Sequence, residues 1–512
     1  MGISAAEHGL SAPTAHSAEA EVDRLFFAER AADLRIQAAR ARLRFSDQQL
    51  SVYERLILAA AGQGLERLHL IQGRAGRGKT FVVQAAINQL RADQHVLAIS
   101  GATGLSASAF LRGATIHRNF AIPVVEDLEA APVASKLKAG DRIWDFLADC
   151  STIIIDEIWA LHRSVIEAVD EVLQRITGVQ QPFGGKAVFA VGHPRQTAPD
   201  VKHGGKPQVL ENSFLASPLF NAFCLHELTE SMRHADDVDF SAWVDNIGDD
   251  TAKGDVDITQ FVRATTSLSD AQHFLFPPYV VREPAAAAGR AFLSPFNAAV
   301  AEFNVAVLDS LSGEQHVIKS FDAVKGDVDE GHAALADPDC LNELNQPGTP
   351  PHLLRLKEGA LCVVMRNFSA ADGLVKNAKV AVERCRRRTV TVRVLSTGET
   401  FTLPRITFEF QPSNFPFRIE RKQIPLRLAY ALTFHGCQGA TLEKTVIDCR
   451  LPVFTHGQRY ASVSRCRHRS HSIALLSDAN GGHVAALQAR LPVQINNIVF
   501  QEFVQARPTS TA

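Results

Sequence analysis

The sequence predicts an α/β fold with two regions of alternating strands and helices, and a small β-barrel inserted into the second. In the first region, short continuous apolar runs alternate with helical patterns, as expected for parallel strands covered on both faces. In the second region the alternation begins at 291–295 and resumes near Leu428. The segment between them is rich in strands and turns, which is typical of a small barrel. The apolar runs of the first region are 68–71, 96–100, 151–155 and 187–191.

The N-terminal 44 residues form a predicted extension that is partly helical. The helical pattern starts at Glu21 and carries several arginines near its end. A solvated helix with basic residues near its C-terminus explains this pattern more simply than a dedicated binding arm does. A second helix is expected from Phe45 to about Ala61, with Ser46 or Asp47 as its N-cap.

A phosphate-binding loop follows the first apolar run. Residues 73–80 read Gly-Arg-Ala-Gly-Arg-Gly-Lys-Thr, a full match to the pattern G-x-x-x-x-G-K-T. The glycines let the backbone turn tightly around an anion, and N–H groups of the loop and of the helix 80–90 cradle phosphates. Lys79 is expected to reach the β- and γ-phosphates, and the Thr80 hydroxyl to hold Mg²⁺. The sequence thus predicts a site for a nucleoside triphosphate with Mg²⁺ as cofactor, with nucleotide-binding residues Gly73, Ala75, Gly76, Gly78, Lys79 and Thr80.

Two carboxylates follow the apolar run 151–155. In ATPases with this kind of loop, an Asp at the end of such a strand helps to hold Mg²⁺, and the next Glu polarises the attacking water. A carboxylate pair alone carries little information, because acidic residues often begin loops. Here the pair follows a phosphate-binding loop in an alternating sheet, which favours the functional interpretation. We therefore assign Asp156 to the metal and Glu157 to water activation.

The predicted domain boundaries follow the shifts in pattern. Residues 321–350 are acidic and then rich in Asn and Pro, so we expect a long loop there. The barrel strands are expected at 359–365, 379–383, 389–394 and 399–403. The predicted parts are the extension 1–44, a first α/β domain 45–265, a second α/β domain 286–355 with 423–480, the inserted barrel 356–422 and a tail 481–512.

Bulk properties exclude several classes of protein. A chain of 512 residues with 46% hydrophobic and 21% charged residues is expected to form two to four globular domains. No apolar run is long enough to cross a bilayer, and the first twenty residues lack the pattern of an export signal. The eight cysteines are scattered singly, which favours reduced thiols over a zinc site or a disulfide framework. Because the net charge is −2, any basic surface must be local.

A series of further motifs follows in a fixed order along the chain. Besides Gln49, the phosphate-binding loop and Asp156-Glu157, the motifs are 100–104, 113–117, 183–186, 192–196, 228–233, 350–359, 366–367, 431–442 and 451–465. Their order resembles that of superfamily-one DNA helicases. The set is most similar to the PIF (petite integration frequency) branch, which is related to RecD and to the helicase part of rolling-circle transposons. The resemblance covers about 45–475, and its last two motifs are the most specific to the branch.

This resemblance implies two RecA-like P-loop NTPase domains with ATP between them. Gln49 would read the adenine, and Gln196 would sense the γ-phosphate. Arg233 and Arg465 would act as arginine fingers, with Gly439 beside the nucleotide on the second domain. Each has an ordinary alternative, such as a surface ion pair for Arg233, but their shared order favours the functional interpretation. The implied catalytic set is Lys79, Asp156, Glu157, Gln196, Arg233 and Arg465.

The family also implies binding to single-stranded DNA and to junctions of single and double strands. Hydroxyl and N–H contacts with phosphates carry no sequence information, which suits a translocating enzyme. Two basic runs, 384–388 and 465–469, are candidates for further electrostatic contacts, although a solvated hairpin explains the first equally well. The implied DNA-contacting residues are Thr103, Thr115, His117, Thr433 and His435.

The chain departs from the family pattern at three places. His193 stands where Asp is usual, 435–437 reads His-Gly-Cys where Asn-Lys-Ser is usual, and Asn-Gly is expected near 376–378. These changes bear on DNA coupling and DNA grip, and leave the ATP site intact.

The resemblance implies an ATP-dependent DNA helicase that moves 5′→3′ on single-stranded DNA. Its expected roles are DNA repair, recombination or genome and telomere maintenance. We expect an intracellular protein, nuclear or mitochondrial if eukaryotic, that acts as a monomer without a membrane partner. One alternative is a degenerate, mobile-element-derived ATPase that binds nucleic acid without productive unwinding. A P-loop kinase or AAA-type ATPase is disfavoured by the motifs at 438–439 and 464–465.

Overall fold

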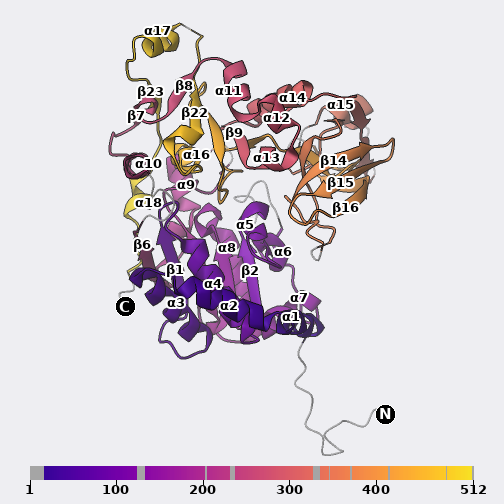
Figure 1. The fold of residues 1–512 in the computed structure, drawn as a ribbon. Coiled ribbons are helices and arrows are strands. Elements are labelled where there is room, and N and C mark those ends of the chain that lie inside the picture. Colours follow the sequence, from indigo (N-terminus) through magenta and orange to yellow (C-terminus); the bar gives the residue numbers. More distant parts are fainter. Residues whose placement is uncertain are drawn as a thin grey trace, which may run out of the picture. The chain divides into compact units, whose positions relative to one another are not determined.

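The computed structural model forms two compact units, each with its own parallel sheet (Figure 1). Unit 1 comprises 1–194, 198–233 and 505–512, and unit 2 comprises 195–197 and 234–504. Among the described helices, none combines the length and the apolar character that a membrane crossing requires. The structure describes residues 17–123, 133–201, 204–230, 237–326, 335–344, 346, 348–369, 372–412, 415–479 and 481–509.

Unit 1 is built around a six-stranded parallel sheet of order β3-β2-β4-β5-β1-β6. The four apolar runs of the sequence are confirmed as its four inner strands. Apolar side chains of these strands pack against the helices that flank the phosphate-binding loop, for example Leu56 and Val83 against Ile71 and Phe189. The strands are β1 (Leu68–Gly73), β2 (Leu97–Gly101), β3 (Ala114–Thr115), β4 (Thr152–Asp156), β5 (Ala187–Gly192) and β6 (Cys224–Leu228).

The helices of unit 1 include both predicted N-terminal segments. Ser46 is the N-cap of the third helix, because its hydroxyl accepts a hydrogen bond from the backbone N–H of Gln49. Phe27 and Leu34 of the extension pack on Ala92, so this part of the extension belongs to unit 1. The helices are α1 (Ala18–Ala28), α2 (Ala31–Arg42), α3 (Asp47–Ala60), α4 (Lys79–Ala92), α5 (Gly104–Ser108), α6 (Ile116–Asn119), α7 (Arg142–Asp149), α8 (Arg163–Thr177) and α9 (Lys206–Glu211).

Unit 2 contains a five-stranded parallel sheet of order β20-β9-β21-β22-β8. Its strands are β8 (Arg263–Thr265), β9 (Arg290–Ser294), β20 (Ala431–Thr433), β21 (Lys444–Asp448) and β22 (Ser472–Leu475). A separate antiparallel pair joins β7 (Asp255–Asp257) to β23 (Gln494–Asn496). Besides α15, which is described below, the helices are α10 (Val238–Asp249), α11 (Leu268–Leu275), α12 (Pro278–Val281), α13 (Pro284–Ala288), α14 (Asn297–Ser310), α16 (Gln458–Val463), α17 (Gly482–Gln488) and α18 (Gln501–Gln505).

The β-rich insertion is an open sheet rather than the predicted barrel. Its five strands are antiparallel in the order β16-β15-β14-β13-β19, and the two end strands do not pair with each other. A closed barrel is therefore not confirmed for the described residues. The four predicted strands are present, and sequence reasoning missed the fifth. They are β13 (Leu361–Val364), β14 (Lys379–Cys385), β15 (Thr389–Val394), β16 (Thr400–Pro404) and β19 (Leu426–Leu428).

The prediction of a long loop at 321–350 is wrong in part, because this segment contains a strand and a helix. It begins with strand β11 (Phe321–Lys325), and it contains helix α15 (Pro338–Glu343). The strand pairs with β18 (Arg418–Gln423), nearly a hundred residues away, so no local pattern announces it. The third strand of this sheet is β17 (Ile406–Phe410), and β10 (His316–Lys319) pairs separately with β12 (Leu353–Leu356).

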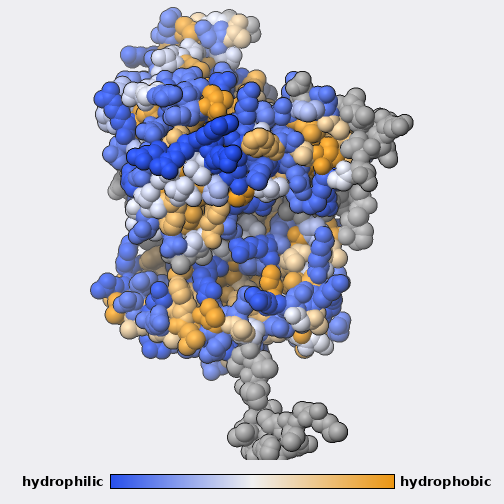
Figure 2. Space-filling view, turned by 90° about the vertical axis from the view of Figure 1, so that its right-hand side faces the viewer, coloured by the Kyte–Doolittle hydropathy of each residue, from blue (hydrophilic) through white to orange (hydrophobic). Residues whose placement is uncertain are grey.

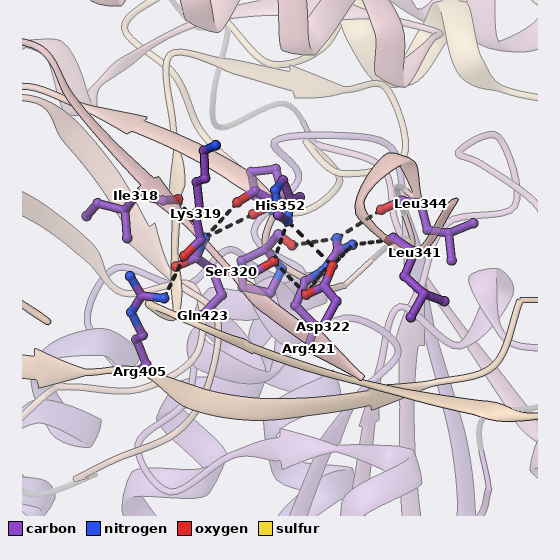
Figure 3. Close-up of polar contacts among 12 residues, drawn as sticks. Ile318, Lys319, Ser320, Asp322, Leu341, Leu344, His352, Arg405, Arg421 and Gln423 are labelled. Carbon is purple, nitrogen blue, oxygen red and sulfur yellow. Dashed lines mark hydrogen bonds and ion pairs between the residues drawn. The ribbon is translucent and has the colours of Figure 1, made fainter. Parts of the chain in front are cut away.

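A buried ion pair holds this segment together (Figure 3). The side chains of Arg421 and Asp322 are almost fully buried, and their closest N···O distance is 2.7 Å. The same guanidinium donates hydrogen bonds to the backbone carbonyls of Leu341 and Leu344 (3.0 and 2.9 Å). It also donates to the carbonyl of Pro350 at 3.3 Å. The Arg421 side chain therefore connects α15 and the residues after it to strands β11 and β18.

Replacing Arg421 with methionine is expected to lower the free energy of unfolding by about 3–5 kcal/mol, because the Asp322 carboxylate is left buried without its cation. Chemical denaturation of the purified protein measures this loss. Lys325 is the matched control, since its ion pair with Glu409 lies in the same sheet but is solvent-exposed. Lys325→Met is expected to change the free energy of unfolding far less, because solvent screens an exposed ion pair. Equal losses in the two variants would contradict the assigned role.

Candidate nucleotide and nucleic-acid sites

The carboxyl ends of the unit 1 strands lie side by side at one edge of the sheet. In the register, Gln72 pairs with Gly192, Val191 pairs with Asp156, and Asp156 pairs with Gly101. The loops that leave β1, β5, β4 and β2 are therefore neighbours. In open parallel sheets this edge is where ligands bind.

The phosphate-binding loop has the backbone that its glycines permit. Gly76 and Gly78 have φ values of 77° and 83°, in the left-handed region. A Cβ on Gly73 would lie 2.7 Å from the carbonyl oxygen of Leu228, so a larger residue does not fit there. The Lys79 ammonium donates hydrogen bonds to the carbonyls of Gly73 (2.5 Å) and Arg74 (3.2 Å). Lys79 is thus held against the loop.

The other predicted ligands around the loop differ in exposure. Thr80 is the second residue of α4, and it is exposed. Ala75 is buried within the loop. Gln49 is also buried; its amide nitrogen donates to the carbonyl of Arg77 (3.3 Å), and its amide oxygen accepts from the backbone N–H of Ser46. Gln49 therefore lies against the loop, with its side chain also completing the N-terminal cap of α3.

Asp156 and Glu157 lie at the end of β4 and are both nearly buried. Burial, and then the neighbouring Glu157 carboxylate, raise the pKa of Asp156 to about 8, and the Lys79 ammonium opposes this rise. Lys79 is therefore close enough to act on Asp156 electrostatically. Glu157 has a φ of 58°, a left-handed conformation that is strained for a residue with a Cβ.

The donors at this edge suit Mg²⁺. Thr80 offers a hydroxyl oxygen and Asp156 a carboxylate oxygen, and hard cations of this kind prefer oxygen ligands. A bound cation would also favour the ionised form of Asp156, against the rise in its pKa. His193 follows β5, between β4 and β1, and is buried at the same edge. An imidazole adds no negative charge there.

Three predicted DNA contacts lie at the ends of β2 and β3 or just after them. Thr103 is the N-cap of α5, and its hydroxyl accepts from the backbone N–H of Ser106 (3.1 Å). Thr115 precedes α6 as its N-cap residue, without a side-chain capping bond. His117 lies in α6, where burial lowers its pKa, so the ring is neutral at pH 7. Thr103 therefore has a structural function that sequence reasoning did not assign to it.

The predicted residues of the second half gather around the turn after β20. The Thr433 hydroxyl accepts from the backbone N–H of Gly436 at 2.9 Å. The ring of His435 stacks on that of Phe454, with centroids 6.5 Å apart. Gly439 is exposed with a φ of 80°. The turn also holds the departure Cys437, which is buried and donates through its thiol to the carbonyl of Phe434.

The side chain of Arg465 is hydrogen-bonded to this turn. Its guanidinium is 1% exposed and donates to the carbonyls of Cys437 (3.4 Å) and Ala440 (3.2 Å). Gln196 is buried in the same unit, and its backbone carbonyl would lie 2.3 Å from a Cβ on Gly457. The structure thus places Lys79, Asp156 and Glu157 together in unit 1, and Gln196, Gly439 and Arg465 in unit 2. Arg233 lies outside the described residues.

Unit 2 contains a basic pocket, and the basic run 384–388 contributes the only part of it that the sequence analysis predicts. A cavity of about 520 Å³ is lined by Phe321, Arg387, Arg388, Arg405 and Lys422. The Phe321 ring is 68% exposed, and the Arg405 guanidinium lies 4.7 Å from its centroid. None of these four cations pairs with a carboxylate among the residues that the structure describes. Figure 2 shows strongly hydrophilic residues gathered in a band on the face that is turned toward the viewer.

The second predicted basic run, 465–469, is less available for electrostatic contacts with DNA. Arg469 forms an ion pair with Asp237, the N-cap of α10, through several hydrogen bonds that include Nε to Oδ2 at 2.9 Å. These hydrogen bonds hold the pKa of Asp237 well below its usual range. The charge of Arg469 is therefore already neutralised within unit 2. No local sequence pattern indicates this pairing, because its two residues are 232 positions apart.

Two family models match the chain. The model described as PIF1-like helicase matches residues 44–257, and the model described as DNA helicase Pif1, 2B domain, matches residues 339–383. A curated relative, the ATP-dependent DNA helicase PIF1 of Mus musculus, is 25% identical over 441 residues. That match covers 85% of this chain and 60% of the relative, so the chain spans somewhat less than two thirds of its length.

Solved structures of Bacteroides Pif1 share the fold. The structure bound to ssDNA has a TM-score of 0.63 at 20% identity, covering 84% of this chain and 91% of that one. The complex with ADP-AlF3 and ssDNA has a TM-score of 0.62 at 19% identity, covering 88% and 99% respectively. Family models over separate parts of the chain, relatives from animals and bacteria, and this shared α/β fold agree. The chain thus matches PIF1-like helicase domains at residues 44–257 and 339–383, and it is similar to PIF1 helicases over most of its length.

Proposed function

We propose that this protein is an ATP-dependent DNA helicase that moves 5′→3′ along single-stranded DNA, with the two parallel sheets as its RecA-like domains. The observation that carries the proposal is the meeting of Lys79, Asp156 and Glu157 at one edge of the unit 1 sheet. Relatives named as DNA helicases, and the family-specific order of the remaining motifs, support the DNA substrate. A role in repair, recombination or telomere maintenance follows from the family alone.

Each residue of this edge has a part in ATP hydrolysis. The loop N–H groups and Lys79 bind the phosphates, and Thr80 with Asp156 would hold Mg²⁺, which neutralises phosphate charge when bound. Glu157 accepts a proton from the attacking water, and its strained backbone fixes where the carboxylate points. Gln196 and the arginines Arg233 and Arg465 would respond to the γ-phosphate. Their catalytic roles rest on the family pattern.

Strand polarity tests the proposal. A partial duplex with a single-stranded 5′ overhang is expected to be unwound in the presence of Mg²⁺ and ATP, while the same duplex with a 3′ overhang stays intact. Strand displacement in a gel or by fluorescence measures both. A non-hydrolysable ATP analogue controls for passive melting. Unwinding from the 3′ overhang alone would contradict the proposed direction.

The DNA path is proposed to include the basic pocket of unit 2. Unpaired cations attract the phosphate backbone, and an exposed aromatic ring offers a surface on which a base stacks. Thr103, Thr115 and His117 in unit 1, and Thr433 and His435 in unit 2, supply further contacts. We expect the active form to be a monomer, and sedimentation with and without DNA tests this expectation.

Removing two charges from the pocket is expected to weaken DNA binding in a salt-dependent way. In the Arg387→Ala/Arg405→Ala variant, the slope of log affinity against log salt should fall by about 2, one for each lost phosphate contact. Fluorescence anisotropy of labelled single-stranded DNA over a salt series measures the slope. Arg384→Ala is the control, because Arg384 belongs to the same basic run but does not line the pocket. An unchanged slope in the double variant would exclude the pocket from the DNA path.

A second candidate function is an ATPase that binds nucleic acid without productive unwinding. The departures at His193 and at 435–437 favour it, since both bear on the coupling between ATP and DNA. The strand-displacement experiment, together with assays of ATP hydrolysis and DNA binding, distinguishes the two functions. A degenerate enzyme hydrolyses ATP and binds DNA, but displaces no strand from either overhang.

A further inference from the structure

Three potential metal ligands meet in unit 1, away from the nucleotide site. His69 lies on β1, and Cys224 and His226 lie on β6. The two strands pair in parallel, with His69 opposite Cys224 and Ile71 opposite His226. Cys224 and His226 are two residues apart, so their side chains point to the same face of β6. The ligand atoms of all three lie within 4.8 Å of one another.

The three side chains are buried, and their polar atoms face one another. Their exposed fractions are 1% for His69, 6% for Cys224 and 8% for His226. His69 Nδ1 and His226 Nε2 are 2.9 Å apart, and the rings stack with centroids at 5.1 Å. Neutral imidazole is the form that binds metals.

We propose that His69, Cys224 and His226 bind one borderline-soft divalent cation of the Zn²⁺ type. Two imidazole nitrogens and one thiolate form a donor set that zinc prefers, whereas Mg²⁺ prefers oxygen ligands. The Mg²⁺ that accompanies ATP therefore does not compete for this site. Three protein ligands leave one of the four tetrahedral positions to water or to a further side chain.

Two charged side chains face the cluster. The Glu66 carboxylate is close enough to act electrostatically on Cys224 and His69. Its negative charge offsets the charge of a bound cation. The Arg55 guanidinium of α3 is close enough to act electrostatically on Cys224 and His226. With a cation on the thiolate, Arg55 is expected to turn away, because it is a solvent-exposed side chain.

A cation at this site connects the edge strand β6 to its neighbour β1. β6 is the last strand in the order, and β1 is its partner within the sheet. His69 lies four residues before Gly73, so about 13 Å of strand separates the cluster from the phosphate-binding loop. The cation is thus a structural element of unit 1, and it takes no part in phosphate chemistry. The ordinary alternative is a hydrogen bond between two buried histidines without a metal.

Metal analysis of the full chain tests the proposal. The purified protein is stripped with a chelator, dialysed against equimolar Zn²⁺ and analysed by mass spectrometry for metal content. We expect one zinc per chain and a higher melting temperature than that of the stripped protein. Co²⁺ in place of zinc should give a thiolate-to-cobalt charge-transfer band. A wild-type chain that retains no zinc would overturn the proposal in favour of the histidine hydrogen bond.

Variants separate ligand loss from misfolding. Cys224→Ser is expected to lose the zinc and the charge-transfer band, while Cys340→Ser, which changes an exposed cysteine outside the cluster, keeps both. His226→Cys replaces one ligand by another and is expected to retain the zinc with a stronger thiolate band. His316→Asn is the control for histidine. Zinc retained in Cys224→Ser with an unchanged cobalt spectrum would place the metal elsewhere and overturn the assignment.

Discussion

Replacing Lys79 with alanine is expected to lower ATP turnover by about 10²–10³-fold or more, the loss found when a single group that stabilises developing charge is removed. The ammonium is held by two loop carbonyls and acts on Asp156, so its removal takes positive charge from the phosphates and from the carboxylate pair. ATP affinity should fall together with turnover. Phosphate-release kinetics and binding of a fluorescent nucleotide measure the two effects.

Lys138→Ala is the control for this substitution, because Lys138 is exposed in the same unit and outside the loop. It should hydrolyse ATP at the wild-type rate. A Lys79→Ala protein that keeps more than a small fraction of its turnover would place the ATP site elsewhere in the chain.

Replacing Glu157 with glutamine is expected to stop hydrolysis by a different route, with a loss of about 10²–10⁴-fold. The amide keeps the size of the side chain but cannot accept the proton of the attacking water. Glu157 is also one of the groups that raise the pKa of Asp156. Its neutralisation therefore favours the ionised form of Asp156, so ATP with Mg²⁺ should bind at least as tightly as in the wild type.

The two substitutions are informative as a pair. Nucleotide binding should be weakened in Lys79→Ala and preserved in Glu157→Gln, while both proteins fail to turn over. Glu171→Gln, an exposed glutamate on α8, serves as the control. Equal losses of ATP affinity in the two variants would remove the distinction between phosphate binding and water activation.

The elements predicted best from the sequence are those that local pattern determines. The inner strands of unit 1 are short apolar runs, and the loop at 73–80 is defined by its glycines and by Lys79. The N-cap Ser46 follows from its place before a helical pattern. In each case the interacting groups are close in the chain, so the sequence carries the information directly.

The elements that escaped prediction depend on partners far away in the sequence. Strand β11 exists because β18 pairs with it and because Arg421 neutralises Asp322. The fifth strand of the open sheet, β19, is likewise remote from its neighbour β13. The cluster of His69 with Cys224 and His226 joins residues about 157 positions apart. Because of this separation, the spacing of the cysteines along the sequence favoured reduced thiols over a zinc site. No window of local sequence shows such contacts.

The measurement that tests the account most directly is ATP hydrolysis with and without single-stranded DNA. The wild-type protein should hydrolyse ATP slowly alone and several-fold faster with saturating single-stranded DNA, because the proposed enzyme couples the site at Lys79 and Glu157 to movement along a strand. Heparin at matched charge controls for a general polyanion effect and should not reproduce the increase. The same rate with DNA, with heparin and with neither would contradict the proposed helicase.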